Sequence, residues 1–375
     1  MPMHNSVVPR EGLKGDFFIK LLSRIALNPA LTGAILLAAR LTTRGENLSI
    51  LHHTAFSRVR TLFLLGLARV VNNWLTDRAL NNGISDKYDW RNREIVVITG
   101  GAGGIGGHVV KFLAEKGVKV AVLDIIPMTF EKPHNVYYYK CDITSITEIK
   151  AVAQKVRAEV GYPTVLINNA GVARGKSILE AKEKDVRFTF DVNTMAHYWL
   201  VQEFLPDMVE NNHGMIVTVA SIASWVTVPN MVDYAASKAA ALSFHEGLTA
   251  ELATRYNAPK VRTVSVHQGY TKTPLFQGYN NTKDFLLPTL EPETVAEAIV
   301  RQVLSGRSGQ VICPPLANAL PLLAFLPLWF QDQMRKEGAE IMPKWHGRQV
   351  VENLETFYEG KEKDVEGSQV LVPKP

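Results

Sequence analysis

Short apolar runs alternate with windows of helical apolar spacing through the middle of the chain, from Glu94 to Val311. Apolar runs bounded by turn residues are typical of buried strands. We expect strands at Ile95–Thr99, Val118–Asp124, Val136–Cys141, Val165–Asn168, Met215–Ala220, Val261–His267 and Gln310–Cys313, and helices near residues 105–116, 145–159, 191–211 and 233–256. This alternation predicts an α/β domain built on a parallel sheet with helices on both faces.

The segment before this domain is apolar and basic. Ile25–Ala39 carries no charge and is flanked by Lys20, Arg24, Arg40 and Arg44. It is too short to span a bilayer comfortably, and extending it back to Phe17 reaches spanning length only by including two cations. The segment can therefore be interpreted as an interfacial or re-entrant helix, as a transmembrane helix or as a cleaved signal peptide. A second stretch, Leu62–Leu75, is interrupted by polar residues and looks amphipathic.

The chain after the last strand differs again in character. Pro314–Phe330 is apolar but contains four prolines, which argue against a regular transmembrane helix. The tail, about residues 331–375, mixes charges with little periodicity, and we expect it to be partly disordered. We therefore predict three regions: a basic, apolar membrane-associating leader at 1–90, a catalytic domain at 91–315, and an apolar stretch with a charged tail at 316–375.

The charge distribution points to a membrane partner. Of the net charge of +5, residues 1–90 hold 11 Lys and Arg against 6 Asp and Glu, and the remainder holds 30 of each. A basic apolar leader on a neutral body favours an anionic membrane surface and disfavours nucleic acid. Cys141 and Cys313 cannot form a disulfide framework, so we expect two buried thiols facing a reducing compartment. We expect no metal site.

A glycine-rich segment follows the first expected strand. Thr99 to Gly107 reads Thr-Gly-Gly-Ala-Gly-Gly-Ile-Gly-Gly and opens a helix, where backbone amides can bind a pyrophosphate. Seven strands with this fingerprint after the first predict a Rossmann-type, doubly wound, seven-stranded parallel sheet. We assign cofactor contacts to Gly100, Gly104, Ile105 and Gly106. No Gly-Lys-Ser/Thr element is present, which excludes a P-loop.

One acidic residue ends the second expected strand, and another comes just after the third. Asp124 lies where a carboxylate accepts hydrogen bonds from the adenosine ribose. It would repel a 2′-phosphate, and neither Gly103 nor Ile125 supplies a cation to bind one, so NAD is favoured over NADP. We expect Asp142 to accept a hydrogen bond from the adenine amine, and the alternative is that it serves as an ordinary helix cap.

Tyr234 and Lys238 stand four residues apart in Tyr-Ala-Ala-Ser-Lys, on one face of an expected helix. An ammonium about 4 Å from the phenol would favour the phenolate by about 4 kcal/mol. Such a tyrosine approaches the pKa that general acid/base catalysis needs. A solvated helix face is the alternative interpretation.

Together, these motifs resemble those of the short-chain dehydrogenase/reductase family over about residues 93–315. The glycine motif, an Asn-Asn-Ala-Gly element at Asn168–Gly171, the Tyr-x-x-x-Lys pair, Ser221 at a strand end and Asn193 follow in the family's order. The resemblance implies that Tyr234 is the general acid/base, that Lys238 lowers its pKa and holds the nicotinamide ribose, and that Ser221 orients the substrate oxygen. It also implies that Asn193 holds a relay water and that Asn169 and Thr273 contact the cofactor. Ser224 is a weaker candidate for the serine.

The sequence departs from the family at one place. After the sixth strand, where the family has Pro-Gly, the chain reads His267-Gln268-Gly269. Losing the proline would loosen the loop over the nicotinamide and makes Thr273 a less secure contact.

The segments Asn211–Ser221 and Pro288–Val295 resemble the family's membrane-associated branch, which contains retinol dehydrogenases and lipid-droplet hydroxysteroid dehydrogenases. We therefore predict an NAD-dependent dehydrogenase of a lipophilic alcohol or ketone, on the cytosolic side of the endoplasmic reticulum or on lipid droplets. Glycosylation sequons at Asn47 and Asn280 are a contrary sign. An NADPH-dependent carbonyl reductase and a catalytically silent dinucleotide-binding scaffold are the alternatives, and a homodimer stays open. Trp225, Val228, Phe276 and Phe285 are candidates for the substrate pocket or for plain core packing.

Overall fold

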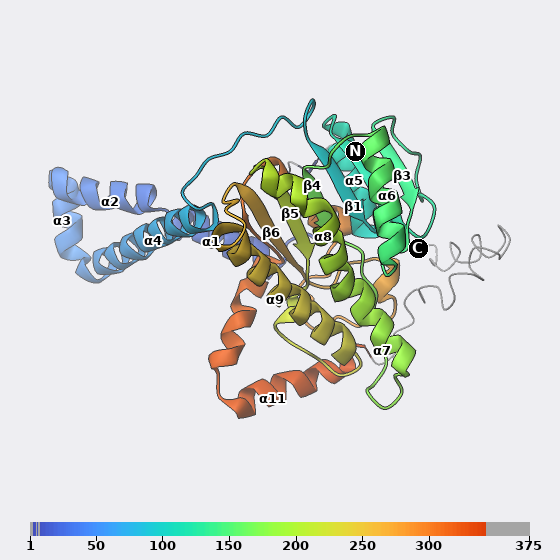
Figure 1. The fold of residues 1–375 in the computed structure, drawn as a ribbon. Coiled ribbons are helices and arrows are strands. Elements are labelled where there is room, and N and C mark those ends of the chain that lie inside the picture. Colours follow the sequence, from blue (N-terminus) through green and yellow to red (C-terminus); the bar gives the residue numbers. More distant parts are fainter. Residues whose placement is uncertain (1–2, 5, 7, 343–375) are drawn as a thin grey trace. The chain divides into compact units, whose positions relative to one another are not determined.

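The computed structural model describes residues 3–4, 6 and 8–342 (Figure 1). The chain divides into two compact units. Among the described residues, one unit lies within Ser6–Ile84, and the other holds those from Ser85 onward together with residues 3–4. The second of these contains the sheet and is called the catalytic unit below.

The catalytic unit is built on one sheet of seven parallel strands in the order β3-β2-β1-β4-β5-β6-β7. This confirms the predicted Rossmann-type, doubly wound fold. Central strands such as Ile95–Thr99 are continuous apolar runs because helices bury both of their faces. The strands are β1 (Ile95–Thr99), β2 (Lys119–Asp124), β3 (Val136–Lys140), β4 (Val165–Asn168), β5 (Gly214–Val219), β6 (Val261–Gln268) and β7 (Gly309–Cys313).

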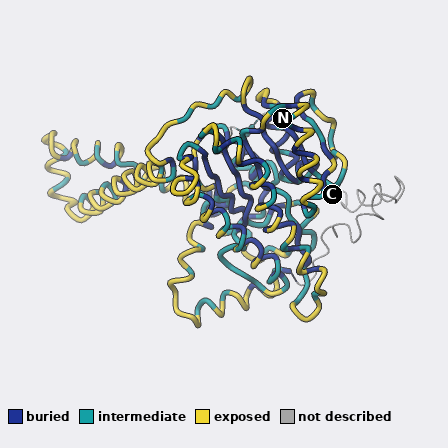
Figure 2. Tube along the Cα trace, viewed as in Figure 1, coloured by how far each residue is buried: buried dark blue, intermediate teal, exposed yellow. Residues whose placement is uncertain are grey.

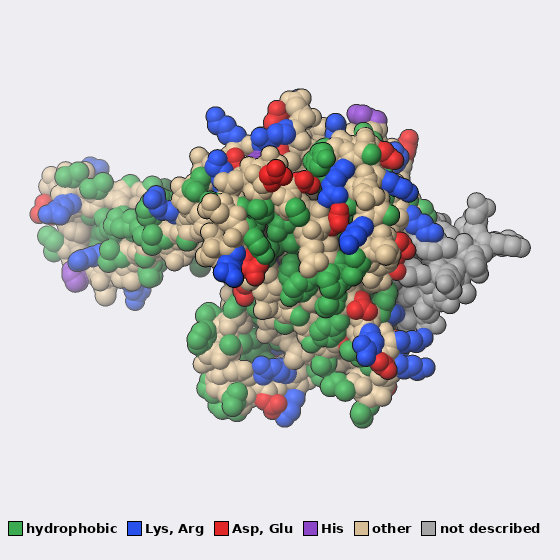
Figure 3. Space-filling model, viewed as in Figure 1, with side chains coloured by type: hydrophobic (Ala, Val, Ile, Leu, Met, Phe, Trp, Pro, Cys, Tyr) green, Lys and Arg blue, Asp and Glu red, His purple; other side chains and the backbone are tan. Residues whose placement is uncertain are grey.

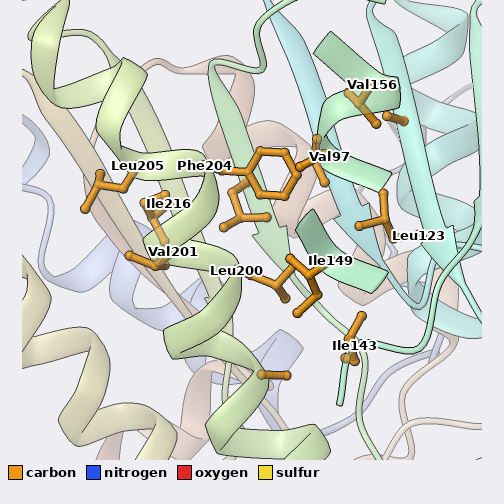
Figure 4. Packing of buried hydrophobic residues seen from close by; sticks show 14 of the residues in the cluster. Val97, Leu123, Ile143, Ile149, Val156, Leu200, Val201, Phe204, Leu205 and Ile216 are labelled. Atoms are coloured by element: carbon orange, nitrogen blue, oxygen red, sulfur yellow. The ribbon is translucent and has the colours of Figure 1, made fainter. Parts of the chain in front are cut away.

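Two sets of helices cover the sheet. On one face α5 (Gly104–Glu115) and α10 (Pro292–Leu304) pack over a Val- and Ile-rich layer. On the other, α6 (Ile146–Glu159), α8 (Ala196–Glu210) and α9 (Val232–Thr254) enclose a second core. Leu200 and Phe204 of α8 meet Ile149 of α6 and Val97 and Leu123 of the sheet there (Figure 4).

Two helix assignments and one prediction of burial need correction. The helix expected at 191–211 starts earlier, because α7 (Glu183–Phe190) runs through the π-helical turn η1 (Asp191–Met195) into α8. The sequence of α7 is mostly polar, so this helix was not predicted. The helix α10 was not predicted, although Val295, Ile299, Val300 and Val303 repeat at helical spacing and are all buried. Cys141 is buried as expected, whereas Cys313 is only partly buried.

The N-terminal unit consists of four helices, α1 (Gly15–Ala26), α2 (Pro29–Leu41), α3 (Thr43–Leu51) and α4 (His53–Leu80). Asn28 separates the first two, since its side chain accepts hydrogen bonds from the amides of Ala30 and Leu31 and caps α2. The uncharged run is therefore divided between two helices. Gly15–Leu41 is nevertheless long and apolar enough to cross a membrane, by length and composition only. Figure 2 shows that most residues of this unit are exposed.

The chain beyond β7 forms the 3-10 helix η4 (Pro315–Phe325), then α11 (Leu328–Glu337) and the short turn η5 (Gly338–Glu340). The prolines do prevent a regular α-helix in the first part. Residues 331–337, which belong to the expected tail, are helical. Residues 343–375, where partial disorder was expected, lie outside the described residues.

Candidate active site

A cavity of about 930 Å³ lies at the carboxyl ends of the strands. Ligands of open parallel sheets bind at this edge, next to the point where strand order reverses, which here is between β1 and β4. Most of the residues predicted to form the site line this one cavity. They are Gly100, Gly104, Ile105, Gly106, Asp124, Asp142, Asn169, Ser221, Tyr234, Lys238 and Thr273.

The glycine loop is built by contacts that exclude side chains. Gly100 and Gly104 have φ values of +66° and +54°, where a side chain is strained. A Cβ on Gly106 would lie 2.2 Å from the carbonyl oxygen of Gly100 and 2.5 Å from Nδ2 of Asn169. The first turn of α5 contains no acidic residue, and the N–H groups at a helix N-terminus suit an anion.

Asn169 braces this loop from the neighbouring strand. Its Nδ2 donates to the carbonyl oxygens of Thr99 and Gly100, both at 3.0 Å. In return, the Thr99 hydroxyl accepts hydrogen bonds from the amides of Asn169 and Ala170, both at 3.1 Å. Thr99, which the motif identified only by its position, therefore helps to shape the loop.

The two acidic residues have different local partners. Asp124 accepts hydrogen bonds from the amides of Ala102 (2.9 Å) and Ile126 (3.2 Å), which fix the carboxylate at the cavity wall. Asp142 accepts from the amide and hydroxyl of Thr144. The alternative of an ordinary helix cap at Asp142 is wrong, because Ser145 caps α6.

Tyr234 and Lys238 lie in the first part of α9 and are 3% and 2% exposed. The solvated-face interpretation is therefore wrong. The Lys238 Nζ donates to the Val219 carbonyl at 2.8 Å and lies 5.8 Å from the centre of the Tyr234 ring. Phe276 packs edge-on against the same ring, with centroids 5.5 Å apart.

The expected fall in the tyrosine pKa is not found. Burial raises the pKa of Tyr234 to about 12, although the Ser221 side chain partly opposes the rise. Burial also lowers the pKa of Lys238 to about 8. The four-residue spacing placed both groups on one helix face, but the ammonium is directed to a backbone carbonyl. The expected fall assumed a shorter distance between the Lys238 ammonium and the Tyr234 phenol, and it left out the effect of removing both groups from water.

Ser221 follows β5 and faces the cavity. Its hydroxyl donates to the Gln268 carbonyl at 3.3 Å and accepts from the Ala223 amide at 3.1 Å. Ser224 instead donates to the Ser221 carbonyl at 2.6 Å, which holds the turn after β5. The two serines thus have separate positions, and Ser221, unlike Ser224, lines the cavity together with Tyr234.

Asn193 is fully buried in the π-helical turn and is not among the cavity-lining residues. Its Oδ1 accepts from the Val172 amide at 2.8 Å, while Nδ2 donates to the Val172 carbonyl and the Ser237 hydroxyl, both at 2.9 Å. The side chain therefore clamps the strand-end loop against α9. Its predicted role of holding a relay water stays a prediction.

The loop after β6 is held without the family's proline. The Gly269 amide donates to the Cys313 carbonyl at 2.6 Å, and Thr271 pairs with Leu290. These contacts constrain the loop at Gly269 and Thr271, and the expected loosening stays a prediction. Thr273 lies beside the glycine loop, with its Cγ2 3.8 Å from where a Cβ on Gly104 would be.

The opposite wall of the cavity is apolar and comes from distant parts of the chain. Of the pocket candidates, Val228 and Phe276 line it, whereas Trp225 stacks on His267 with ring centroids 4.1 Å apart and Phe285 is 57% exposed. Sequence reasoning missed the C-terminal contribution to this wall, because nothing local predicts where it folds. The wall includes Val172, Phe188, Met231, Leu275, Leu320, Met334 and Ile341.

Comparison with known proteins identifies similar chains. Residues 94–284 match the family model described as short chain dehydrogenase. The chain is 47% identical over 209 residues to dehydrogenase RED2 of Cochliobolus heterostrophus, covering 55% of this chain and 78% of that protein. It is 34% identical over 252 residues to estradiol 17-beta-dehydrogenase 11 of Homo sapiens, covering 65% and 83%. A short-chain dehydrogenase structure from Streptomyces avermitilis has a TM-score of 0.53 at 21% identity over 65% of this chain and 94% of that chain, which is a likeness of fold alone.

Proposed function

Because the chain belongs to the short-chain dehydrogenase family, it is an oxidoreductase acting on CH–OH groups, and we propose that it transfers a hydride between NAD(H) and a lipophilic alcohol or ketone. One observation carries the proposal. Tyr234 is buried in the wall of a largely apolar cavity that Ser221 and Lys238 also line, with Lys238 one helical turn from the tyrosine.

The proton is moved at the Tyr234 hydroxyl. In ketone reduction the phenol gives its proton to the substrate oxygen, and in alcohol oxidation it takes the proton back. A pKa near 12 keeps the phenol protonated, which suits the acid role. The base role needs the positive charge of Lys238 to stabilise the phenolate. Ser221 donates to the substrate oxygen and holds it at the phenol.

The glycine loop fits a dinucleotide. A Cβ at Gly106 would fill the space beside Gly100, and the N-terminus of α5 offers backbone N–H groups to a pyrophosphate. Asn169 keeps the loop in this shape, and Thr273 flanks it. The bound cofactor would supply or accept the hydride.

Asp124 supports NAD as the cofactor. Its carboxylate is fixed at the cavity wall by the amides of Ala102 and Ile126, beside the uncharged residues Gly103 and Ile125. A 2′-phosphate at this position would face a negative charge, whereas ribose hydroxyls would donate to it.

A substrate screen tests the reaction and its substrate class. Purified full-length protein would be mixed with NAD and, in turn, retinoids, steroids and long-chain alcohols, with NADH absorbance as the readout. Turnover of apolar alcohols, with little turnover of short polar ones, is the expected result. Dinucleotide binding without any turnover would favour the silent scaffold, and a strong preference for NADPH would favour the carbonyl reductase.

We also propose that the N-terminal unit anchors the protein at the endoplasmic reticulum or on lipid droplets, with the catalytic unit in the cytosol. Gly15–Leu41 has the length and composition of a membrane span, and large apolar side chains such as Ile35 and Leu37 are exposed. Burial of these apolar side chains in the bilayer and attraction of Arg40 and Arg44 to anionic lipid would together hold the protein at the membrane.

Cell fractionation tests the anchor. The full-length protein should pellet with membranes and resist high salt, whereas Ile35→Asn with Leu37→Asn should release much of it. Ile178→Asn, at an exposed position of the catalytic unit, is the matched control and should stay in the pellet. Release of the wild-type protein by salt alone would contradict insertion of the apolar run.

A further inference from the structure

The segment after β7 exposes large apolar side chains on the catalytic unit itself. Within residues 315–329, which we call the proline edge, Leu322 is 61% exposed, Phe325 86%, Leu328 80% and Trp329 73%. Figure 3 shows hydrophobic side chains gathered over this part of the molecule. Side chains of this size, so close together in the chain, are unusual on a surface that meets only water.

The same segment forms a wall of the active-site cavity. Leu320 lines the cavity from within the proline edge, and Met334 and Ile341 line it from just beyond. Gly338 fits so closely against Val228 that a Cβ there would lie 2.4 Å from its Cγ1. Met342 packs in one buried cluster with Tyr234 and Met231. Leu320 of the proline edge and the residues that follow it therefore lie on the substrate side of the site, while other apolar residues of the proline edge face the outside.

The chemistry of the proline edge matches a lipid bilayer. No charged residue occurs from Pro314 to Phe330, and charges return at Asp332, Arg335 and Lys336. Trp329 lies at this boundary, where aromatic side chains favour the membrane interface. The 3-10 helix with its prolines is too short to span, so the contact would lie in the interface plane.

We propose that the proline edge is a second bilayer contact, separate from the N-terminal unit, and that lipophilic substrate passes beside it between the membrane and the cavity. The passage of substrate rests on the proposed function, but the bilayer contact does not. An apolar alcohol would then reach Tyr234 without crossing water, because Leu320 and Met334 continue the apolar path inward.

Site-specific fluorescence on the full-length chain tests the contact. A nitrobenzoxadiazole dye would be attached at Phe325→Cys or, as the matched control, at Tyr162→Cys, both in a Cys313→Ala background. Tyr162 is 63% exposed and precedes β4, at the amino edge of the sheet, away from the cavity. Vesicles of phosphatidylcholine and phosphatidylserine should raise the emission severalfold at position 325 only, and spin-labelled lipid should quench it. Thermal unfolding of each variant shows that it is folded.

The other outcomes separate the proposals. If the protein sediments with vesicles while the dye at position 325 behaves like the control, the proline edge is not a bilayer contact and the N-terminal anchor stands. If the protein does not sediment at all, both membrane contacts are overturned. High emission at position 325 before lipid is added would show that protein, and not lipid, covers this surface. If that emission rises with protein concentration, the covering protein is a second copy of this chain. Alcohol oxidation is measured separately, by NADH absorbance, so failure of the proposed enzymatic function can be distinguished from failure of the bilayer contact.

Discussion

The Lys238 ammonium donates a 2.8 Å hydrogen bond to the backbone carbonyl of Val219. This contact ties α9 to the end of β5, next to Ser221, and explains how a buried cation is tolerated there. Burial lowers the pKa of Lys238 to about 8, because the interior disfavours the charged form. The lysine is thus held near Tyr234 by the sheet and not by the phenol.

Tyr234→Phe should remove catalysis while leaving the fold and the cofactor site intact. The substitution deletes only the hydroxyl, and the ring keeps its contact with Phe276. We expect turnover to fall by about 10²–10⁴-fold, the usual contribution of general acid/base catalysis. Steady-state rates and NAD affinity by calorimetry would be compared with wild type. A variant that keeps more than about a tenth of the activity would show that another group moves the proton.

Gly106→Ala should damage the dinucleotide site. The added Cβ would lie 2.2 Å from the Gly100 carbonyl, so the loop must move, at a cost of about 1–3 kcal/mol. NAD binding by calorimetry should weaken strongly and the melting temperature should fall. Gly247→Ala is the control, since nothing lies within 4 Å of its Cβ and it should stabilise α9 by about 0.5–1 kcal/mol. Unchanged NAD affinity in Gly106→Ala would place the dinucleotide elsewhere.

Asp124→Ser with Ile125→Arg should shift the preference toward NADP. The change removes the charge that faces a 2′-phosphate and adds a cation that can bind it. Asp124→Asn is the control, because it removes the charge but keeps an acceptor for the Ala102 amide, and it should give a smaller shift. The measurement is the ratio of kcat/KM with the two cofactors. Wild-type protein that already prefers NADP would contradict the proposed role of Asp124.

The sequence predicted all seven strands, most directly the central strands β1 and β4, whose residues are all buried and almost all apolar. It also located the residues of the cofactor side, since Gly106 and Asn169 come from local motifs that meet at one edge of the sheet. The substrate wall was not predictable, because Leu320 and Met334 reach the cavity through tertiary packing. The pKa of Tyr234 depends on desolvation and on where the Lys238 Nζ is directed, and spacing specifies neither.

His213 joins the start of the catalytic unit to the turn before β5 and gives a pH-dependent test of that junction. Its Nδ1 lies 2.6 Å from Asp86 and its Nε2 lies 3.1 Å from Glu94, with the Arg93 guanidinium 2.9 Å from Nε2. Burial opposes protonation, but hydrogen bonds to Glu94 and Asp86 outweigh it and raise the pKa of His213. A raised folded-state pKa means that protonation stabilises the fold.

His213→Gln should therefore destabilise the protein in acid more than in alkali. The stabilisation by wild-type His213 is fully present below its unfolded pKa of about 6.5 and is lost as pH rises through the raised folded value. We expect a loss of about 2 kcal/mol near pH 6, as for hydrogen bonds to charged groups, shrinking toward pH 9. Urea unfolding of both proteins at the two pH values measures the difference. His134→Gln, on an exposed loop before β3, is the control and should show no such dependence. A penalty that is equal at both pH values would mean that His213 stabilises the junction by packing against Tyr88 and not by its charge.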